Sequence, residues 1–203
     1  MKGLYLVTPD WDDTEKMLAV TEAGLRGGAV LVQYRHKTAQ SALRREQASA
    51  LLALCRRHGI PLIINDHVDL CMEIDADGIH VGGTDREVNA VRMAVGADKI
   101  VGASCYGSIE LAQAAYEKGA SYVAFGGFYP SRVKKYEVTT PLSIVSQSKA
   151  LIDLPVVVIG GMTQENAAPL VQQGADLVAV ISSVYMSEQP ASAAEGFSKL
   201  FEV

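Results

Sequence analysis

Two cations and an amide alternate along the segment Gln33-Tyr34-Arg35-His36-Lys37. Side chains at alternate positions of an extended chain point to the same side, so Gln33, Arg35 and Lys37 would share one face. A planar guanidinium and an ammonium group beside an amide are suited to binding phosphate or diphosphate. The spacing predicts an anion-binding clamp, although the end of a solvated surface strand can have the same composition.

Two acidic residues follow apolar runs further along the chain. Asp66 comes directly after Asn65 at the end of one run, and Asp85 follows the segment His80-Val81-Gly82-Gly83-Thr84. Magnesium is typically held by one or two carboxylates together with substrate phosphate oxygens and water. Both aspartates therefore fit a Mg²⁺-diphosphate site. They fit the N-caps of the following helices equally well, because capping is a common role for Asp.

Pairs of small residues follow the last two apolar runs, as Gly160-Gly161 and Ser182-Ser183. Glycine lets the backbone approach a ligand closely. A short helix after Ser182 would direct its N–H groups and the positive end of its dipole toward an anion. We expect a phosphate site here, with a bare tight turn as the alternative for the glycine pair.

The segment 125–135 is rich in glycine, aromatic residues and cations. A long loop at a functional rim is a candidate lid. Lys134 is its best candidate for contact with an anion. The alternative for the neighbouring Arg132 and Lys135 is that they are solvated charges.

Eight short apolar runs of strand character separate these residues, at 4–7, 29–34, 62–64, 78–81, 100–103, 122–125, 156–159 and 177–181. Segments with helical periodicity lie between them, and Gly-Ala precedes a strand at Gly28, Gly119 and Gly174. Near-continuous apolar strands are typical of a parallel sheet covered on both faces, whether open or closed. Polar residues gather at the carboxyl end of each run, and only a barrel brings all eight ends to one rim. We therefore predict an α/β protein, a single (β/α)₈ TIM barrel, with residues 1–203 as one domain.

One proline interrupts a segment with helical periodicity. Pro169 would remove a backbone donor and clash with the preceding turn if it lay well inside a helix. Taking Asn166 as the N-cap places Pro169 in the first turn, where proline is tolerated. We expect this helix to begin after Asn166.

The composition excludes several classes of protein. The 203 residues include 18 Lys and Arg against 23 Asp and Glu, a net charge of −5, so a broad basic surface for nucleic acid is not expected. No apolar run approaches the about 20 residues that span a membrane. The N-terminal segment reaches Pro9 too early for a secretory signal. Three cysteines, Cys55, Cys71 and Cys105, without paired spacing indicate a reducing compartment. We expect a cytoplasmic protein.

The polar segments together resemble those of the thiamine-phosphate synthase family. The matching segments are Gly3-Leu4-Tyr5-Leu6-Val7-Thr8, Gln33-x-Arg35-x-Lys37, Ile64-Asn65-Asp66, Gly78-Ile79-His80-Val81-Gly82 with Asp85, Gly102-Ala103-Ser104-Cys105, Phe125-Gly126, Pro130-Ser131-x-x-Lys134, Ile159-Gly160-Gly161 and Val180-Ile181-Ser182-Ser183. They cover nearly the whole chain in order. The joint set is specific for the superfamily that contains this enzyme and its thiazole tautomerase relatives.

The resemblance implies an enzyme that joins hydroxymethylpyrimidine diphosphate to thiazole phosphate, with thiamine phosphate and diphosphate as products. It implies catalytic roles for Arg35, Lys37, Ser104 and Lys134. The pyrimidine diphosphate would be bound by Gln33, Arg35, Lys37, Asn65, Ser104 and Lys134, and the thiazole phosphate by Ser131, Gly160, Gly161, Ile181, Ser182 and Ser183. Asp66 and Asp85 would bind Mg²⁺ as the cofactor.

The chain departs from the family pattern at two positions. Val133 replaces a second threonine of the loop motif, and Gly83 stands where glutamine is common. A thiazole tautomerase is the nearest alternative, but its catalytic histidine would fall at Gly127. A non-catalytic binding or regulatory protein on the same barrel is the other alternative, because fold does not determine function.

Overall fold

Eight parallel strands pair in chain order and close into a barrel, because β1 pairs with both β2 and β8. The computed structural model describes residues 1–82, 88–130 and 140–202. The strands are β1 (Gly3–Val7), β2 (Ala29–Tyr34), β3 (Leu62–Asn65), β4 (Gly78–Val81), β5 (Ile100–Tyr106), β6 (Tyr122–Phe125), β7 (Val156–Ile159) and β8 (Leu177–Val180). The predicted (β/α)₈ TIM barrel is confirmed.

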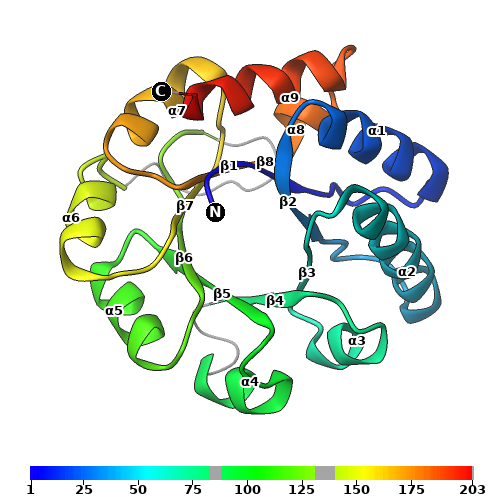
Figure 1. The fold of residues 1–203 in the computed structure, drawn as a ribbon, viewed down its shortest axis with the longest axis horizontal. Helices are drawn as coiled ribbons and strands as arrows, with labels where there is room; N and C mark the ends of the chain where they lie inside the picture. Colours follow the sequence, from blue (N-terminus) through cyan, green and yellow to red (C-terminus); the bar gives the residue numbers. More distant parts are fainter. Residues whose placement is uncertain (83–87, 131–139, 203) are drawn as a thin grey trace.

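Helices surround the barrel in the order of the chain (Figure 1). They are α1 (Thr14–Arg26), α2 (Ser41–His58), α3 (Val68–Glu73), α4 (Val88–Val95), α5 (Ile109–Glu117), α6 (Ile144–Leu151), α7 (Gln164–Gln172), the short α8 (Ser182–Tyr185) and α9 (Pro190–Ser198), followed by a 3₁₀ turn at Lys199–Phe201. Among the helices of the described residues, none is long and apolar enough to cross a membrane.

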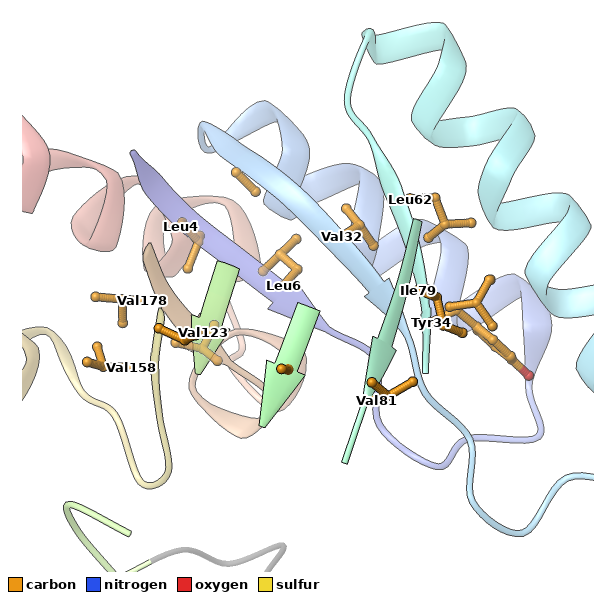
Figure 2. Close-up of a cluster of buried hydrophobic side chains, with 14 of the residues drawn as sticks. Leu4, Leu6, Val32, Tyr34, Leu62, Ile79, Val81, Val123, Val158 and Val178 are labelled. Carbon is orange, nitrogen blue, oxygen red and sulfur yellow. The ribbon is translucent and has the colours of Figure 1, made fainter. Parts of the chain in front are cut away.

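Alternate residues of each strand face opposite sides of the barrel wall, as the strand period of two requires. One set, which includes Leu6, Val32 and Ile79, packs outward against the helices, and Figure 2 shows this cluster. The other set includes Tyr5 and Tyr122 and fills the barrel interior. Both sets are buried, so the strands have nearly continuous apolar sequences.

The Gly-Ala phrase marks the same turn in three of the βα units. Gly28, Gly119 and Gly174 have φ values of 94°, 89° and 104°, which residues with a Cβ atom rarely adopt. Each lies between the end of a helix and the start of the next strand. These turns confirm that the phrase marks a repeated junction.

The predicted start of α7 is wrong. Thr163 is the N-cap, and its side chain accepts from the Asn166 N–H while the Asn166 side chain accepts from the Thr163 N–H. This reciprocal capping box satisfies two backbone donors, and a single polar cap at Asn166 satisfies fewer. Pro169 therefore lies inside the helix rather than in its first turn.

The rim at the strands' carboxyl ends is reinforced by Thr8. Its hydroxyl group donates to the Arg35 carbonyl oxygen at 2.9 Å and accepts from the Arg35 N–H at 2.8 Å. The Thr8 N–H also donates to the Gln33 carbonyl oxygen at 3.0 Å. The pairing of β1 with β2 thus extends past the end of β1 and holds the backbone of the predicted clamp.

Candidate active site

Residues that lie far apart in the sequence surround one cavity of about 920 Å³ at the carboxyl ends of the strands. Every predicted site residue that the structure describes lines this cavity: Gln33, Arg35, Lys37, Asn65, Asp66, Ser104, Gly160, Gly161, Ile181, Ser182 and Ser183. The predicted Asp85, Ser131 and Lys134 lie outside the described residues, as do Gly83 and Val133. The barrel therefore brings the predicted groups together as expected.

The Arg35 guanidinium is held by a carboxylate from the loop after β1. Its Nη1 lies 3.1 and 3.2 Å from the two oxygens of Asp10. The Asp10 carboxylate also accepts from the Lys37 N–H at 2.8 Å. Arg35 is buried whereas Lys37 is exposed. Asp10 thus orders the clamp and offsets part of its positive charge.

Asp66 has a strained backbone at the cavity edge. Its φ is 63°, which is uncommon for a residue other than glycine. Such strain persists where the surroundings impose it, often at functional sites. The Asp66 N–H donates to the His80 carbonyl oxygen at 2.9 Å, and the Asn65 Nδ2 donates to the Asp66 Oδ2 at 2.7 Å.

The N-cap alternative for Asp66 is wrong, because α3 begins after His67 and has no side-chain cap. Asp66 is exposed at the cavity edge, where the Asn65 side chain donates to one of its carboxylate oxygens.

The donor atoms at this edge suit a hard cation. Carboxylate and phosphate oxygens are the ligands that magnesium prefers. Within residues 1–82, 88–130 and 140–202, no three His, Cys, Asp or Glu side chains group closely enough to hold a metal. A magnesium ion at Asp66 would therefore need further oxygens, which a bound diphosphate and water supply.

A chain of polar side chains crosses the interior beneath the cavity. Gln33 Nε2 donates to the Tyr5 hydroxyl group at 2.7 Å, and the Tyr5 and Tyr122 hydroxyl oxygens lie 2.8 Å apart. His80 Nδ1 lies 2.9 Å from the Tyr122 hydroxyl oxygen, and His80 Nε2 lies 2.9 Å from Ser104 Oγ. The His80 ring also stacks on Tyr122, with centroids 5.6 Å apart. Two of the six residues predicted to bind the pyrimidine diphosphate, Gln33 and Ser104, are thus hydrogen-bonded to buried aromatic residues.

Burial controls the ionisation of the groups in and around the barrel. It raises the pKa of Tyr5 and Tyr122 above the ordinary tyrosine range, so both remain protonated near neutral pH. Burial also raises the pKa of Cys55, Cys71 and Cys105, to about 12, about 11 and about 12. The three buried thiols therefore stay protonated near neutral pH.

The loops after β7 and β8 form the other part of the cavity. Gly160 and Gly161 have φ values of 110° and 63°. A Cβ atom on Gly161 would lie 2.3 Å from the Pro130 carbonyl oxygen, so only glycine fits. The Ser183 hydroxyl group donates to the Met162 carbonyl oxygen and joins the two loops. The hydrogen of that hydroxyl group is therefore already used within the protein.

Two hydrogen bonds hold the described residues of the loop after β6. The Thr140 hydroxyl group donates to the Gly126 carbonyl oxygen at 2.6 Å, and the Tyr129 hydroxyl group donates to the Asn166 carbonyl oxygen at 3.0 Å. Gly127 lines the cavity with a φ of 81°. It carries no side chain where a tautomerase would have its histidine.

Sequence reasoning missed several residues that line the cavity. They are Tyr5, His80, Tyr106, Tyr129 and Thr140. Tyr5 and His80 lie within apolar runs and have the pattern of core residues. Only their position on the inward face of a strand distinguishes Tyr5 and His80 from other core residues. Which face points inward can be assigned only when the register of the barrel strands is known.

This fold and site define a class, a TIM-barrel enzyme with two anion-binding regions in one cavity. One region is the clamp that contains Arg35 and Lys37, and the other is formed by the glycines after β7 and the serines after β8. The chain belongs to the thiamine monophosphate synthase family, whose model matches residues 4–184.

Relatives with curated names agree with this family. The chain is 63% identical over 201 residues to thiamine-phosphate synthase of Janthinobacterium sp. (strain Marseille), covering 99% of this chain and 97% of the relative. It is 46% identical over 199 residues to thiamine-phosphate synthase of Thiobacillus denitrificans, covering 98% and 94%. The solved structure of thiamine phosphate pyrophosphorylase from Pyrococcus furiosus superposes with a TM-score of 0.85 at 30% identity, covering 98% of this chain and 95% of that one.

Proposed function

We propose that the protein is a Mg²⁺-dependent thiamine-phosphate synthase. It transfers the hydroxymethylpyrimidine group from its diphosphate to thiazole phosphate. The observation that carries this proposal is a single cavity lined both by Arg35 and Lys37 and by Gly161 and Ser182. Two substrates that each carry phosphate require two anion-binding regions within reach of one reaction centre. The family match and the relatives' names support the same reaction.

The transfer breaks one bond and forms another. The bond between the pyrimidine methylene carbon and the diphosphate oxygen breaks, and the oxygen leaves with the electron pair. The thiazole nitrogen then donates its lone pair to the methylene carbon. Negative charge grows on the leaving diphosphate, so Arg35 and Lys37 in fixed positions lower the barrier. Lys134 would add a third cation according to the family pattern.

Magnesium bound at Asp66 and Asp85 would neutralise part of the charge on the leaving diphosphate. The exposed Asp66 carboxylate at the cavity edge fits this role. The backbone of Asp66 holds the carboxylate there at a cost in strain, which supports a functional role.

The cavity walls exclude water from the reacting carbon. Val7, Ala124, Val157, Ile159 and Ala179 contribute apolar surface to it. A carbocation at the methylene carbon reacts readily with water, so an apolar wall favours capture by the thiazole nitrogen. Holding the two rings in register supplies a further part of the rate enhancement.

The proposed partners are the two small-molecule substrates, with no nucleic acid and no membrane. The net charge of −5 supports the expectation that the protein does not bind nucleic acid. We place the reaction in the cytoplasm, and the three free, buried cysteines support a reducing compartment.

An assay of the purified protein tests the proposal. Hydroxymethylpyrimidine diphosphate, thiazole phosphate and Mg²⁺ are mixed with the protein, and thiamine phosphate is followed as fluorescent thiochrome after oxidation. We expect product only when both substrates are present, with loss of turnover on adding a chelator. Isomerisation of the thiazole without transfer would instead support the tautomerase, and binding without any product would support a regulatory protein.

A further inference from the structure

Three buried residues connect Gln33 to Ser104 across the barrel interior, and the reaction described above gives them no role. Tyr5, Tyr122 and His80 come from β1, β6 and β4, and their exposed fractions are 1%, 3% and 8%. The four successive contacts measure 2.7, 2.8, 2.9 and 2.9 Å. A Cβ atom on Gly102 would lie 2.0 Å from the Tyr122 ring, so the chain makes room for this phenol at a specific position.

Each link in this chain has one hydrogen to donate. A phenol group has one O–H, and a neutral imidazole has one N–H. Leaving a buried donor without an acceptor is costly. The direction of the first hydrogen bond therefore determines the direction of the next, along the whole chain.

In one direction, the Gln33 amide nitrogen donates to Tyr5, Tyr5 donates to Tyr122, and Tyr122 donates to His80 Nδ1. His80 then carries its proton on Nε2 and donates it to Ser104 Oγ. The Ser104 hydroxyl hydrogen remains available to the cavity. In the opposite direction, Ser104 donates to His80 and presents only lone pairs to the cavity. In the structure the Gln33 Nε2 donates to the Tyr5 hydroxyl oxygen, which is the first hydrogen bond of the first arrangement.

We propose that Tyr5, Tyr122 and His80 are positioning residues that transmit the orientation of the Gln33 amide to Ser104, with His80 held as the Nε2–H tautomer. Ser104 is thereby kept as a donor toward the substrate. Diphosphate oxygens only accept hydrogen bonds, so a serine that donates fits the proposed substrate. The inference depends on the proposed function only for the identity of that substrate.

The His80 tautomer can be observed directly by NMR. Protein labelled with ¹⁵N-histidine is studied without ligand in mildly alkaline buffer, where imidazoles are generally neutral. The His80 signals are assigned with His80→Gln, or by elimination with variants of the other three histidines. We expect the ¹⁵N shifts of a protonated Nε2 and an unprotonated Nδ1. A protonated Nδ1, or an even mixture of tautomers, overturns the proposal.

A remote substitution tests whether the direction is transmitted. Gln33→Glu replaces the amide donor by a carboxylate that only accepts, so the chain should reverse and place a proton on His80 Nδ1. Tyr122→Phe breaks the chain. Adding Gln33→Glu to Tyr122→Phe should therefore leave the His80 shifts as they are in Tyr122→Phe alone. No change with Gln33→Glu alone, or the same change in both backgrounds, contradicts the proposal.

The matched control is Tyr34→Phe. This change removes a buried phenol hydroxyl group that donates to Gln47 Oε1 at 2.9 Å on the outer face of β2. It should leave the His80 tautomer as in the wild type. A shift of the His80 tautomer with Tyr34→Phe would contradict a role specific to the interior chain.

Kinetics provide a second readout. Tyr122→Phe should lower kcat/KM for the pyrimidine diphosphate about tenfold, the effect of losing one buried hydrogen bond. The KM for thiazole phosphate should stay within about twofold, as expected of a residue that acts on one substrate. Equal losses for both substrates contradict the proposal. If the wild-type protein forms no thiamine phosphate, the proposed function is overturned. The His80 tautomer is measured without substrate, so that result does not depend on the proposed function.

Discussion

Asp10 and Arg35 form a two-oxygen ion pair at the cavity, with both carboxylate oxygens within 3.2 Å of one guanidinium nitrogen. Arg35 is buried, with a side chain that is 8% exposed, and Asp10 is 34% exposed. A buried guanidinium without a partner is costly, so Asp10 stabilises the clamp before any substrate binds. The remaining N–H groups of Arg35 are then directed by this contact rather than by the substrate.

Asp10→Asn should weaken the clamp. The change removes the charge partner of Arg35 and keeps a similar shape, so we expect kcat/KM for the pyrimidine diphosphate to fall about tenfold, or about 1.4 kcal/mol. Steady-state kinetics measure this effect. Asp13→Asn is the control in the same loop, because asparagine also caps α1 well. Equal kinetics for the two variants would show that Asp10 does not order the clamp.

Asp66→Asn should reduce magnesium affinity while preserving the fold. Asparagine tolerates the φ of 63° at this position, so the backbone strain is unchanged. Loss of the carboxylate charge should weaken Mg²⁺ binding in the presence of diphosphate by at least about tenfold, or about 1.4 kcal/mol. Isothermal titration calorimetry measures the affinity, and circular dichroism checks the fold.

The control for Asp66 is Asp75→Asn. Asp75 also has a positive φ, of 55°, and is exposed, but it pairs with Lys99 away from the cavity. Its replacement should leave magnesium affinity unchanged. If Asp66→Asn binds Mg²⁺ as the wild type does, Asp66 is not a ligand.

Gly161→Ala should damage the proposed thiazole phosphate site. The new Cβ would meet the Pro130 carbonyl oxygen at 2.3 Å, and the φ of 63° adds strain. We expect a higher KM for thiazole phosphate and a stability loss of about 1–3 kcal/mol. Gly174→Ala is strained in the same way at φ 104°, but its Cβ meets only Lys149 Cγ at 3.4 Å. It should lose stability with an unchanged KM, and a raised KM there would indicate a general effect of strain.

Pro169→Ala should stabilise the protein. Pro169 is exposed inside α7 and has no N–H to donate to the preceding turn. Alanine restores this donor, and we expect about 1 kcal/mol, which raises Tm by about 2–4 °C for a domain of this size. Thermal unfolding followed by circular dichroism measures Tm. A lower Tm would show that the proline ring packs favourably against its neighbours.

Much of the fold follows from local pattern. The runs at 29–34, 78–81, 122–125 and 156–159 coincide with β2, β4, β6 and β7, because buried parallel strands are apolar on both faces. The extension of β5 to Tyr106 was not predicted. It includes a register shift between Ser104 and Tyr106, which depends on pairing with β6 rather than on the sequence of β5.

The site was predictable where polar residues end the strands. Arg35 and Asp66 stand out there because a purely apolar strand gives no reason for their presence. Tyr5 and Tyr122 do not stand out, since an aromatic residue within a strand normally packs in the core. Their inward direction depends on barrel register, and Asp10 becomes relevant only when the loop after β1 is folded over β2.

A crystal structure with diphosphate and thiamine phosphate bound would show whether one cavity binds two phosphorylated groups in separate regions. We expect diphosphate against Arg35 and Lys37, and the phosphate of thiamine phosphate against Gly161 and Ser182, with the pyrimidine between them. Both anions in the same region, or thiamine phosphate bound outside the cavity, would contradict this expectation.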